Sequence, residues 1–389
     1  MLKQKKTVLL FISLFMVFIL ASCRDEEPSR LSDTLKLELE YDNLSYIDDG
    51  IGVATLASCE DGDTAEFNVD DNRIRVRFLG VDTPEASYKY EPWGLQATQY
   101  ACEKLTEADE IVLERDWDGT LQEQNGRYLA FIWVDGKLLN LMLIEDSYSR
   151  ATGVLSLKYG ETMFDAGIEA AEEQKRINGE TDPLFDYSSE GEEITLETLV
   201  LNPDNYRLKR VSVEGVVTAR KGNHFFIKQG DYGIYVNAGY TDNSNVVEIG
   251  DYIELSDVQA LYDLDRYGGL YIGDYTNRKV TIVSEDNEIL PKETTIDALT
   301  DRVNGLLVEL NDLEIIEIIS ISDYYYQLIV EDDLGNQLIV EHPEDAYLSN
   351  RVPIETFEVG QIIDVIGPLS QTPNGFKQYI THADKIINK

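Results

Sequence analysis

The sequence predicts a mainly β protein, with an α+β head followed by two small β-barrels in tandem. Three observations lead to this class. Segments in which apolar and polar residues alternate recur along the chain, glycine-containing turns separate them, and helical patterns occur within residues 92–176. The length of 389 residues and an apolar content of 43% suit two or three hydrophobic cores.

The head is expected to occupy residues 49–180 as a small barrel with helices. Its predicted strands are bounded by Asp-Gly and Asp-Asp-Asn turns and cover residues 51–57, 64–69, 73–81, 110–116 and 128–134. Its predicted helices have apolar residues at helical spacing and cover residues 92–106, 138–145 and 161–176. Residues 116–126 are predicted to form a mobile loop that presents Arg127.

Two similar sets of strand-like segments follow an acidic linker predicted at residues 181–193. The first, at residues 194–290, contains VSVEGVVTARKGNHFFIKQGDYGIYV, VEIGDYIEL and YGGLYI. The second, at residues 291–389, contains LLVELNDLEIIEII, YYYQLIVEDDLGNQLIVE, FEVGQIIDVIG and GFKQYI. Five short strands in this order suit a small Greek-key barrel of the OB type, so each set is predicted to be one such barrel.

The stretch RFLGVDTPE in the head gathers charged and hydroxyl residues at the end of a predicted strand. In the run RIRVRF, Arg73, Arg75 and Arg77 alternate with apolar residues. A strand therefore directs the arginines to one face and the apolar side chains to the other. Pro84 ends the strand, which leaves Glu85 in a turn.

Oxygen-bearing residues in and near this stretch are candidate ligands for a metal ion. Asp63 lies in the tight sequence DGDT, and Asp82 and Thr83 lie in RFLGVDTPE. Hard divalent cations such as calcium take carboxylate and carbonyl oxygens as ligands, and calcium tolerates irregular oxygen cages better than magnesium does. The pattern therefore favours a calcium site.

Two arginines and a further acid complete the set of residues with chemical roles. Arg77 and Arg127, the latter within NGRYLAFIWVDG, carry planar guanidinium groups that match the oxygens of a phosphodiester. Glu85 is a carboxylate close to the metal ligands in sequence, and such a group can orient or deprotonate the attacking water. The combined interpretation is metal-assisted phosphodiester hydrolysis.

Three motifs taken together resemble the thermonuclease, or staphylococcal-nuclease-like, family. These are DGDT at 61–64, R-FLGVDTPE at 77–85 and NGRYLAFIWVDGKLLN at 125–140, and the resemblance covers residues 53–179. It implies a five-stranded OB-type barrel with three helices. It also implies a calcium-dependent nuclease that cleaves DNA and RNA to products with 3′-phosphate ends.

The resemblance implies a role for each of six residues. It assigns calcium binding to Asp63, Asp82 and the carbonyl of Thr83, action on the water to Glu85, and binding of the phosphate to Arg77 and Arg127. The two C-terminal sets of strands resemble the OB-type accessory domains found beside nuclease domains in large secreted bacterial nucleases.

The N-terminus has the pattern of an export signal. Residues 1–22 combine three lysines with the apolar run VLLFISLFMVFIL, and they end in a sequence that resembles a bacterial lipobox with Cys23 as the lipidated residue. Two acyl chains on Cys23 give stable membrane attachment. The predicted location is the extracytoplasmic face of the cell membrane, with residues 23–48 as a tether. The alternative is an ordinary secretory signal with an incidental cysteine.

The charge of the chain is unusual for a protein that acts on nucleic acids. There are 33 Lys and Arg against 73 Asp and Glu, a net charge of −40. General attraction to phosphate backbones comes from positive charge, so substrate capture must depend on local arginines and bound metal. Weak binding that improves with calcium is expected. Alternatively, the acidic surface serves solubility alone.

The remaining cysteines and the histidines carry no clear site pattern. Cys59 and Cys102 are either small buried hydrophobes or, in an oxidising exterior, a disulfide. His224, His342 and His382 lack ligand spacing and are expected at the surface.

Tyrosines are frequent in both C-terminal sets, and they leave two interpretations open. The residues concerned are Tyr232, Tyr235, Tyr262, Tyr267, Tyr271, Tyr275, Tyr324, Tyr325 and Tyr326. Aromatic residues on an OB face stack nucleic-acid bases, but tyrosine is also a favoured strand residue. Because basic residues are few here, a structural role or a glycan or protein partner is favoured.

The sequence therefore predicts a surface-anchored, calcium-dependent endonuclease acting on DNA or RNA. The alternative is a non-catalytic surface lipoprotein that binds nucleic acid, glycan or protein through its OB-like domains. A structural adhesin led by those domains is a third possibility. Degenerate copies of this fold lose acidic or arginine positions, whereas all six are present here, which favours the enzyme.

Overall fold

The structure is a computed structural model that describes residues 30–117, 119–123, 126–238, 247–263, 268–300, 304–322, 325–342, 353–372, 375–379 and 386–388. The chain divides into two compact units. The first comprises Met1–Cys59, Asp63–Asp82 and Ala101–Asn178, and the second comprises Glu60–Gly62, Thr83–Tyr100 and Gly179–Lys389. Within the described ranges, no helix has the length and apolar character needed to cross a membrane. The predicted signal and Cys23 lie outside these ranges.

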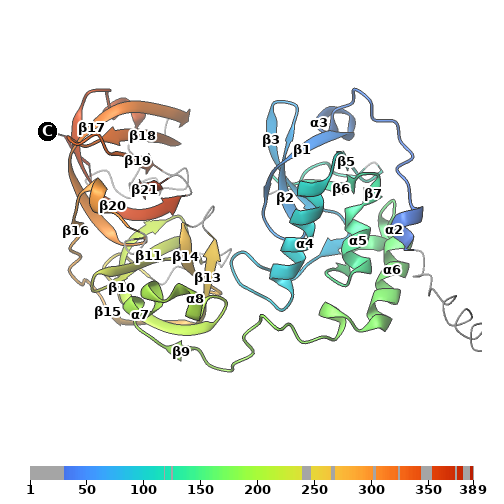
Figure 1. The fold of residues 1–389 in the computed structure, drawn as a ribbon, viewed down its shortest axis with the longest axis horizontal. Helices are drawn as coiled ribbons and strands as arrows, with labels where there is room; N and C mark the ends of the chain where they lie inside the picture. Colours follow the sequence, from blue (N-terminus) through green and yellow to red (C-terminus); the bar gives the residue numbers. More distant parts are fainter. Residues whose placement is uncertain are drawn as a thin grey trace, which may run out of the picture. The chain divides into compact units, whose positions relative to one another are not determined.

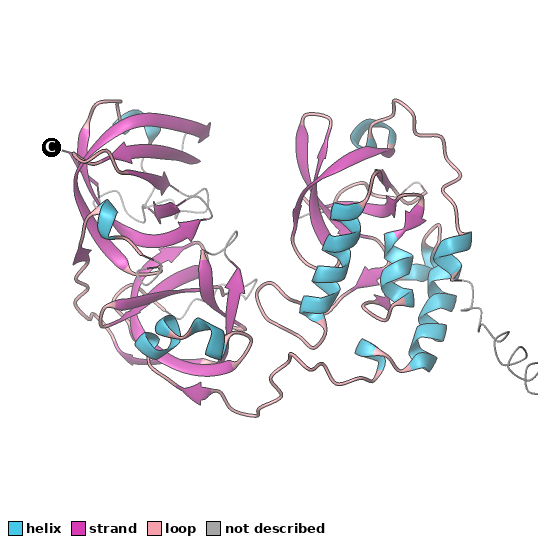
Figure 2. Cartoon of the chain, in the orientation of Figure 1, coloured by secondary structure: helices cyan, strands magenta, loops and turns pink. Residues whose placement is uncertain are grey.

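A closed five-stranded barrel forms the centre of the head (Figures 1 and 2). Its strands are β1 (Ile51–Cys59), β2 (Thr64–Val69), β3 (Asn72–Phe78), β5 (Ile111–Glu114) and β6 (Tyr128–Val134). They follow the order β3-β2-β1-β5-β6, and a parallel pairing of β3 with β6 closes the ring, while β7 (Lys137–Leu138) extends the edge at β6. The predicted mainly β class with an OB-type barrel is confirmed.

The strand β3 shows the predicted division into two faces. Ile74, Val76 and Phe78 are buried, whereas the three arginines that alternate with them are exposed or half-buried. The antiparallel register with β2 places Thr64 opposite Arg77 and Phe67 opposite Ile74. The apolar face of β3 therefore contributes to the barrel core.

Three longer helices belong to the head region: α4 (Gly94–Glu107), α5 (Leu139–Glu145) and α6 (Gly160–Glu173). Helix α5 is almost entirely buried and packs against α6. Helix α6 ends earlier than predicted, because Gln174 adopts a left-handed conformation with φ 54°, and a short helical turn η2 (Arg176–Asn178) follows. Two short strands, β4 (Val81–Asp82) and β8 (Arg150–Ala151), pair with each other. A further short turn, η1 (Val154–Ser156), precedes α6.

The prediction of a tether is wrong for residues 30–48, which are packed on the head. They include the short helix α2 (Leu31–Thr34), and the short helix α3 (Tyr46–Asp49) begins near their end. The Ser32 hydroxyl donates to Glu145 at 2.5 Å, and the buried Tyr46 hydroxyl donates to the Leu129 carbonyl at 2.6 Å. Long-range contacts of this kind leave no local sequence pattern.

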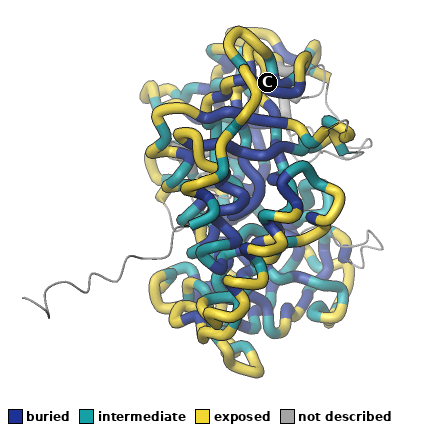
Figure 3. Tube along the Cα trace, turned by 90° about the vertical axis from the view of Figure 1, so that its right-hand side faces the viewer, coloured by how far each residue is buried: buried dark blue, intermediate teal, exposed yellow. Residues whose placement is uncertain are grey.

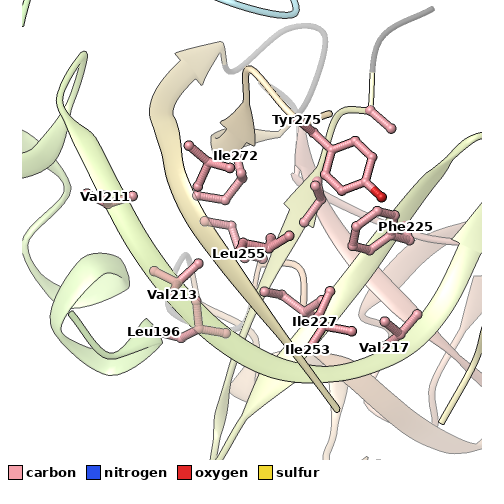
Figure 4. Close-up of a cluster of buried hydrophobic side chains, with 14 of the residues drawn as sticks. Leu196, Val211, Val213, Val217, Phe225, Ile227, Ile253, Leu255, Ile272 and Tyr275 are labelled. Atoms are coloured by element: carbon pink, nitrogen blue, oxygen red, sulfur yellow. The ribbon is translucent and has the colours of Figure 1, made fainter. Parts of the chain in front are cut away.

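The first C-terminal barrel repeats the strand order of the head. Its strands are β10 (Arg210–Lys221), β11 (His224–Gln229), β12 (Tyr232–Val236), β13 (Tyr252–Asp263) and β14 (Gly269–Gly273), closed by pairing of β10 with β13. Strands β9 (Glu192–Glu193) and β15 (Val280–Ser284) extend the edges, and helices α7 (Leu196–Leu201) and α8 (Pro203–Tyr206) precede the barrel. Side chains from β10, β11, β13 and β14 meet in its core (Figure 4).

The second C-terminal barrel has the same plan again. Its strands are β17 (Leu307–Ser322), β18 (Tyr325–Glu331), β19 (Gln337–His342), β20 (Ile362–Thr372) and β21 (Gly375–Tyr379), closed by pairing of β17 with β20. Strands β16 (Lys292–Glu293) and β22 (Ile386–Asn388) lie at its edges, and the short turns η3 (Ile296–Ala298) and η6 (Ile354–Thr356) lie in its connections. In all three barrels the third and fifth strands are parallel neighbours. Buried stretches of the chain lie inside, and the exposed stretches are mainly loops at the outside (Figure 3).

Two predictions about single residues in the barrels are resolved by burial. His342 is fully buried and stacks on the ring of Tyr326 at 5.2 Å, so its prediction as a surface residue is wrong. His224 is half-buried, and His382 lies outside the described residues.

Tyr235, Tyr271 and Tyr275 are also buried, which supports a structural role for these tyrosines. By contrast, Tyr262 is 42% exposed.

Candidate active site

The turn between β1 and β2 brings Asp63 to the end of strand β3. The carbonyl of Asp63 accepts a hydrogen bond from the Phe78 N–H at 2.8 Å. Its carboxylate accepts from the Thr64 hydroxyl at 3.2 Å, and the side chain is only 6% exposed. Asp63 is therefore fixed on the barrel by both its main chain and its side chain.

Arg77 joins the two aspartates that the sequence nominated as metal ligands. One terminal nitrogen of its guanidinium contacts the Asp63 carboxylate, and the other donates to Asp82 Oδ1 at 3.0 Å. The Arg77 side chain is 20% exposed and that of Asp82 is 60% exposed. The two carboxylates thus converge on one cationic group at a surface that solvent can reach.

Asp82 is held by a strand pair that the sequence did not reveal. It lies opposite Arg150 where β4 pairs with β8. Its N–H donates to the hydroxyl of Ser149, a buried residue, at 2.8 Å. Ser149 is therefore a supporting residue of the site, and its sequence surroundings, SYSRA, carry no motif that would have identified it.

Arg127 directly precedes β6, the strand that pairs with β3. The parallel register pairs Arg77 with Leu129, two residues after Arg127 in the chain. A tight turn precedes Arg127, in which Gly126 adopts φ 88° and donates to the Glu123 carbonyl. The Arg127 guanidinium donates to Glu123 Oε2 at 2.8 Å.

Thr83 and Glu85 follow Asp82 in the chain and belong to the second compact unit. There the Thr83 side chain packs directly against Gly62 of the DGDT turn. A Cβ atom on Gly62 would lie 2.8 Å from Thr83 Oγ1 and 2.9 Å from Cγ2. A larger residue at position 62 would force the Thr83 side chain to shift, so glycine suits this turn.

The main chain of Glu85 is closed into a loop by Glu91. The Glu85 N–H donates to Glu91 Oε2 at 3.1 Å, and the Glu91 N–H donates to the Glu85 carbonyl at 2.9 Å. Gly94, the first residue of α4, packs on this loop, since a Cβ there would lie 2.2 Å from the Glu85 carbonyl oxygen. The loop that carries Glu85 therefore has a defined backbone.

The donor set fits a hard cation with few protein side-chain ligands. Within the described residues, no group of three His, Cys, Asp or Glu side chains is arranged to hold a metal. Asp63 and Asp82 already share one positively charged partner, Arg77. Two carboxylates completed by main-chain carbonyls and water match the preferences of calcium.

A disulfide joins the end of β1 to helix α4. Cys59 and Cys102 are bonded, with their Cα atoms 5.8 Å apart. The sequence had left a disulfide and buried thiols as alternatives, and the structure has the disulfide. It cross-links the head just before the turn that carries Asp63.

Comparison with known proteins places this site in a family. The family model for the staphylococcal nuclease homologues matches residues 75–178. The chain is 30% identical over 121 residues to the thermonuclease of Staphylococcus hyicus, an alignment that covers 30% of this chain and 70% of that relative. The chain belongs to the staphylococcal nuclease family.

Two further members of this nuclease family show how much of the chain the similarity covers. The thermonuclease of Staphylococcus intermedius is 33% identical over 94 residues, 23% of this chain and 54% of the relative. Endonuclease YncB of Bacillus subtilis is 33% identical over 103 residues, 26% of this chain and 48% of the relative. The chain thus spans about half the length of these two relatives, and the family match ends before the C-terminal barrels.

Proposed function

We propose that this member of the staphylococcal nuclease family is a calcium-dependent nuclease that hydrolyses phosphodiester bonds of DNA or RNA by internal cleavage. The convergence of Asp63 and Asp82 on Arg77 carries this proposal. It brings two ligands suited to a hard cation together with a guanidinium suited to a phosphate. The relatives named thermonuclease and endonuclease support the same reaction class.

Calcium would be held by the carboxylates of Asp63 and Asp82 and the carbonyl of Thr83. When bound, calcium supplies positive charge that offsets the negative charge developing on the phosphate. The same two carboxylates accept hydrogen bonds from Arg77 in the structure. A cation and Arg77 therefore compete for these oxygens, and occupation by a cation leaves the Arg77 donors available to the substrate.

Arg77 and Arg127 would bind the non-bridging oxygens of the scissile phosphate. Arg77 lies on β3 and Arg127 directly precedes the neighbouring strand β6. Two planar guanidinium groups suit two oxygens of one tetrahedral group. Such donors stabilise the phosphorane-like transition state more than the ground state, because its oxygens carry more negative charge.

Glu85 would act on the attacking water. A Glu85 carboxylate oxygen accepts a proton from the water as the water oxygen forms a bond to phosphorus. The bond between phosphorus and the 5′ oxygen breaks, and that oxygen takes up a proton. The phosphate remains on the 3′ side, which gives the 3′-phosphate product.

The proposed location is the extracytoplasmic face of the cell membrane, with a lipid on Cys23. The LASC sequence at the end of the apolar N-terminal run supports it. A Cys23→Ser variant is expected to leave the membrane fraction for the soluble fraction. Retention of this variant in membranes would contradict lipid anchoring at Cys23.

The nuclease proposal is tested with the full-length chain in detergent, using single-stranded DNA and RNA with calcium or a calcium chelator. Cleavage is expected with calcium and should disappear with the chelator. Glu85→Gln is expected to lower kcat by roughly 10²–10⁴-fold, since a general base contributes that much. Turnover with magnesium in the absence of calcium would contradict the metal assignment, and absence of cleavage with every metal would favour the non-catalytic binding protein.

A further inference from the structure

The segment that carries Glu85 is attached to the first C-terminal barrel by its main chain. The Tyr271 hydroxyl donates to the Ser87 carbonyl at 2.5 Å, and the Asp274 N–H donates to the Tyr88 carbonyl at 2.6 Å. Tyr271 belongs to β14, and Asp274 is the first residue after this strand. Two successive carbonyls of the segment are therefore bound by the barrel.

The side chain of Gln259 on β13 extends this attachment to the next part of the segment. Its Oε1 accepts from the Tyr90 N–H at 2.6 Å, and its Nε2 donates to the Tyr90 carbonyl at 2.8 Å. Gln259 is only 2% exposed. A buried amide that matches both main-chain groups of one residue is specific for that position, because either group left unmatched would be costly.

The side chain of Tyr90 is buried in the same contact. It shares a hydrophobic cluster with Phe226, Tyr235, Leu261 and Tyr271 of the barrel. Only 3% of Tyr90 is exposed, so the segment inserts an aromatic anchor as well as hydrogen-bonding groups.

Asp182 provides a second fixed point for the segment. Its carboxylate accepts from the Tyr90 hydroxyl, the Trp93 N–H and the Gln96 amide, each at 2.7 Å. Burial tends to raise the pKa of Asp182, but hydrogen bonds from Trp93, Tyr90 and other donors outweigh it and hold the pKa below its usual value. Asp182 was expected to lie in a linker, yet it is almost fully buried.

The barrel surface is shaped for this close approach at Gly273. A Cβ atom there would lie 2.6 Å from the Tyr88 carbonyl oxygen and 2.5 Å from Leu261 Cδ1. A glycine is therefore required where the segment meets the end of β14.

These contacts lead directly to Glu85. The attached residues Ser87–Tyr90 lie inside the loop that the reciprocal hydrogen bonds between Glu85 and Glu91 close. A loop closed at its base and fixed at its tip has little freedom, so the main chain at Glu85 is constrained by the barrel.

We infer that the first C-terminal barrel is a positioning module for the nuclease, and that Gln259 and Tyr271 are positioning residues for Glu85. This inference rests on the proposed function, in which Glu85 acts on the water. The chain has a net charge of −40, which does not favour attraction of phosphate backbones. Positioning of Glu85 gives the barrel a role that does not depend on such attraction. Misplacement of a reacting group by about 1 Å costs up to about 100-fold in rate, so a distant attachment can control kcat.

The experiment compares three variants of the full-length chain. Tyr271→Phe removes the hydroxyl that binds Ser87, and Gln259→Leu removes both bonds to Tyr90. Tyr275→Phe is the matched control, since Tyr275 is buried in the same barrel but its hydroxyl faces Asn277 at 3.5 Å. Hydrogen exchange of residues 84–93 measures attachment, and kcat and KM on single-stranded DNA with calcium measure the reaction.

Faster exchange in residues 84–93 and a lower kcat are expected for the two attachment variants. Tyr271→Phe removes one hydrogen bond, so the exchange rate and kcat are each expected to change by roughly 3–10-fold. Gln259→Leu removes two hydrogen bonds, so its effect on both quantities is expected to be larger. KM is expected to stay within about twofold, because the phosphate-binding arginines are unchanged. Tyr275→Phe is expected to alter neither exchange nor kcat.

A double-mutant cycle separates positioning from a general loss of stability. In a Glu85→Gln background, Tyr271→Phe is expected to lower the residual kcat by less than about twofold, because the group being positioned no longer acts. An equal loss in both backgrounds would overturn the positioning role.

The two proposals fail in different ways. If the wild type cleaves nucleic acid but attachment variants exchange faster without any loss of kcat, the positioning role is wrong and the nuclease proposal stands. Unchanged exchange in both attachment variants would overturn the attachment itself. If the wild type cleaves nothing, the proposed function and the positioning role both fail, and faster exchange in the variants would still establish the attachment.

Discussion

The head barrel and the first C-terminal barrel have the same strand order but present different chemistry. In the head, the outward face of β3 and the turn after β1 bring Arg77 to Asp63. In the C-terminal barrel, β13 and β14 present Gln259 and Tyr271, which bind the chain itself. The barrel plan therefore does not determine the function of either region, and the outward residues and turns do.

The two regions also differ in buried charge. Glu114 on β5 of the head is 1% exposed, and its carboxylate lies 2.5 Å from Lys158 Nζ. The carboxylate also accepts hydrogen bonds from Trp133 Nε1 and from the Tyr159 hydroxyl, each at 2.9 Å. Burial, and then the Glu114 carboxylate, raise the pKa of Tyr159, so its hydroxyl stays a donor. The charged pair of Arg210 and Asp257 in the C-terminal barrel is more exposed, at 19% and 33%.

The largest expected effect comes from Lys158→Met in the head. It leaves the buried Glu114 carboxylate without a cation, which costs about 3–5 kcal/mol in the free energy of unfolding. All three tryptophans lie between residues 93 and 133, so denaturant unfolding followed by tryptophan fluorescence reports on this region.

Two further variants control for the loss of a lysine. Lys175→Met removes one side of the exposed pair with Glu173 and is expected to cost less than about 1 kcal/mol. Adding Glu114→Gln to Lys158→Met should restore part of the stability, since the remaining group is neutral. Equal losses for Lys158→Met and Lys175→Met would contradict the expected difference between a buried and an exposed charge pair.

The next effect concerns the outward face of β3. Arg77→Lys keeps the charge but loses the planar pair of donors proposed to bind the phosphate, so kcat should fall by roughly 10²–10³-fold, or about 3–4 kcal/mol. Arg73→Lys on the same strand is the control, because Arg73 is 58% exposed and pairs with Glu66. Cleavage assays with calcium compare the kcat of the two variants. Equal kcat values would show that Arg77 has no special role in the reaction.

The parts of the fold that the sequence predicted are those governed by local periodicity. Strands β2 and β6 match their predicted bounds. Buried residues largely alternate with less buried ones in β2, whereas β6 is a continuous apolar run with a turn at each end. Closed barrels in the C-terminal region were likewise predicted from hairpin turns and strand spacing. Arg77 and Asp82 are only five positions apart in RFLGVDTPE, and their side chains form a hydrogen bond in the structure.

The parts that the sequence did not predict depend on distant partners. Helix α4 begins later than predicted, since Trp93 adopts φ 70° and its N–H is bound by Asp182, 89 positions away. The contact of Tyr90 with Gln259 spans 169 positions, and that of Asp82 with Ser149 spans 67. Local patterns carry no information on such pairs.

The smallest expected effect concerns Arg210→Met in the C-terminal barrel. The hydrogen bond from Arg210 lowers the pKa of Asp257 from its ordinary 3.8, against the opposing effect of partial burial. A depressed carboxylate pKa stabilises the folded state above the ordinary value, and this contribution disappears as pH falls through the folded pKa. The variant should therefore lose about 1 kcal/mol at pH 7 and progressively less as the pH falls below 3.8. Hydrogen exchange of β13 amides at pH 7 and at a pH below 3.8 measures the loss. A loss that is the same at both pH values would show that Arg210 acts through packing rather than charge.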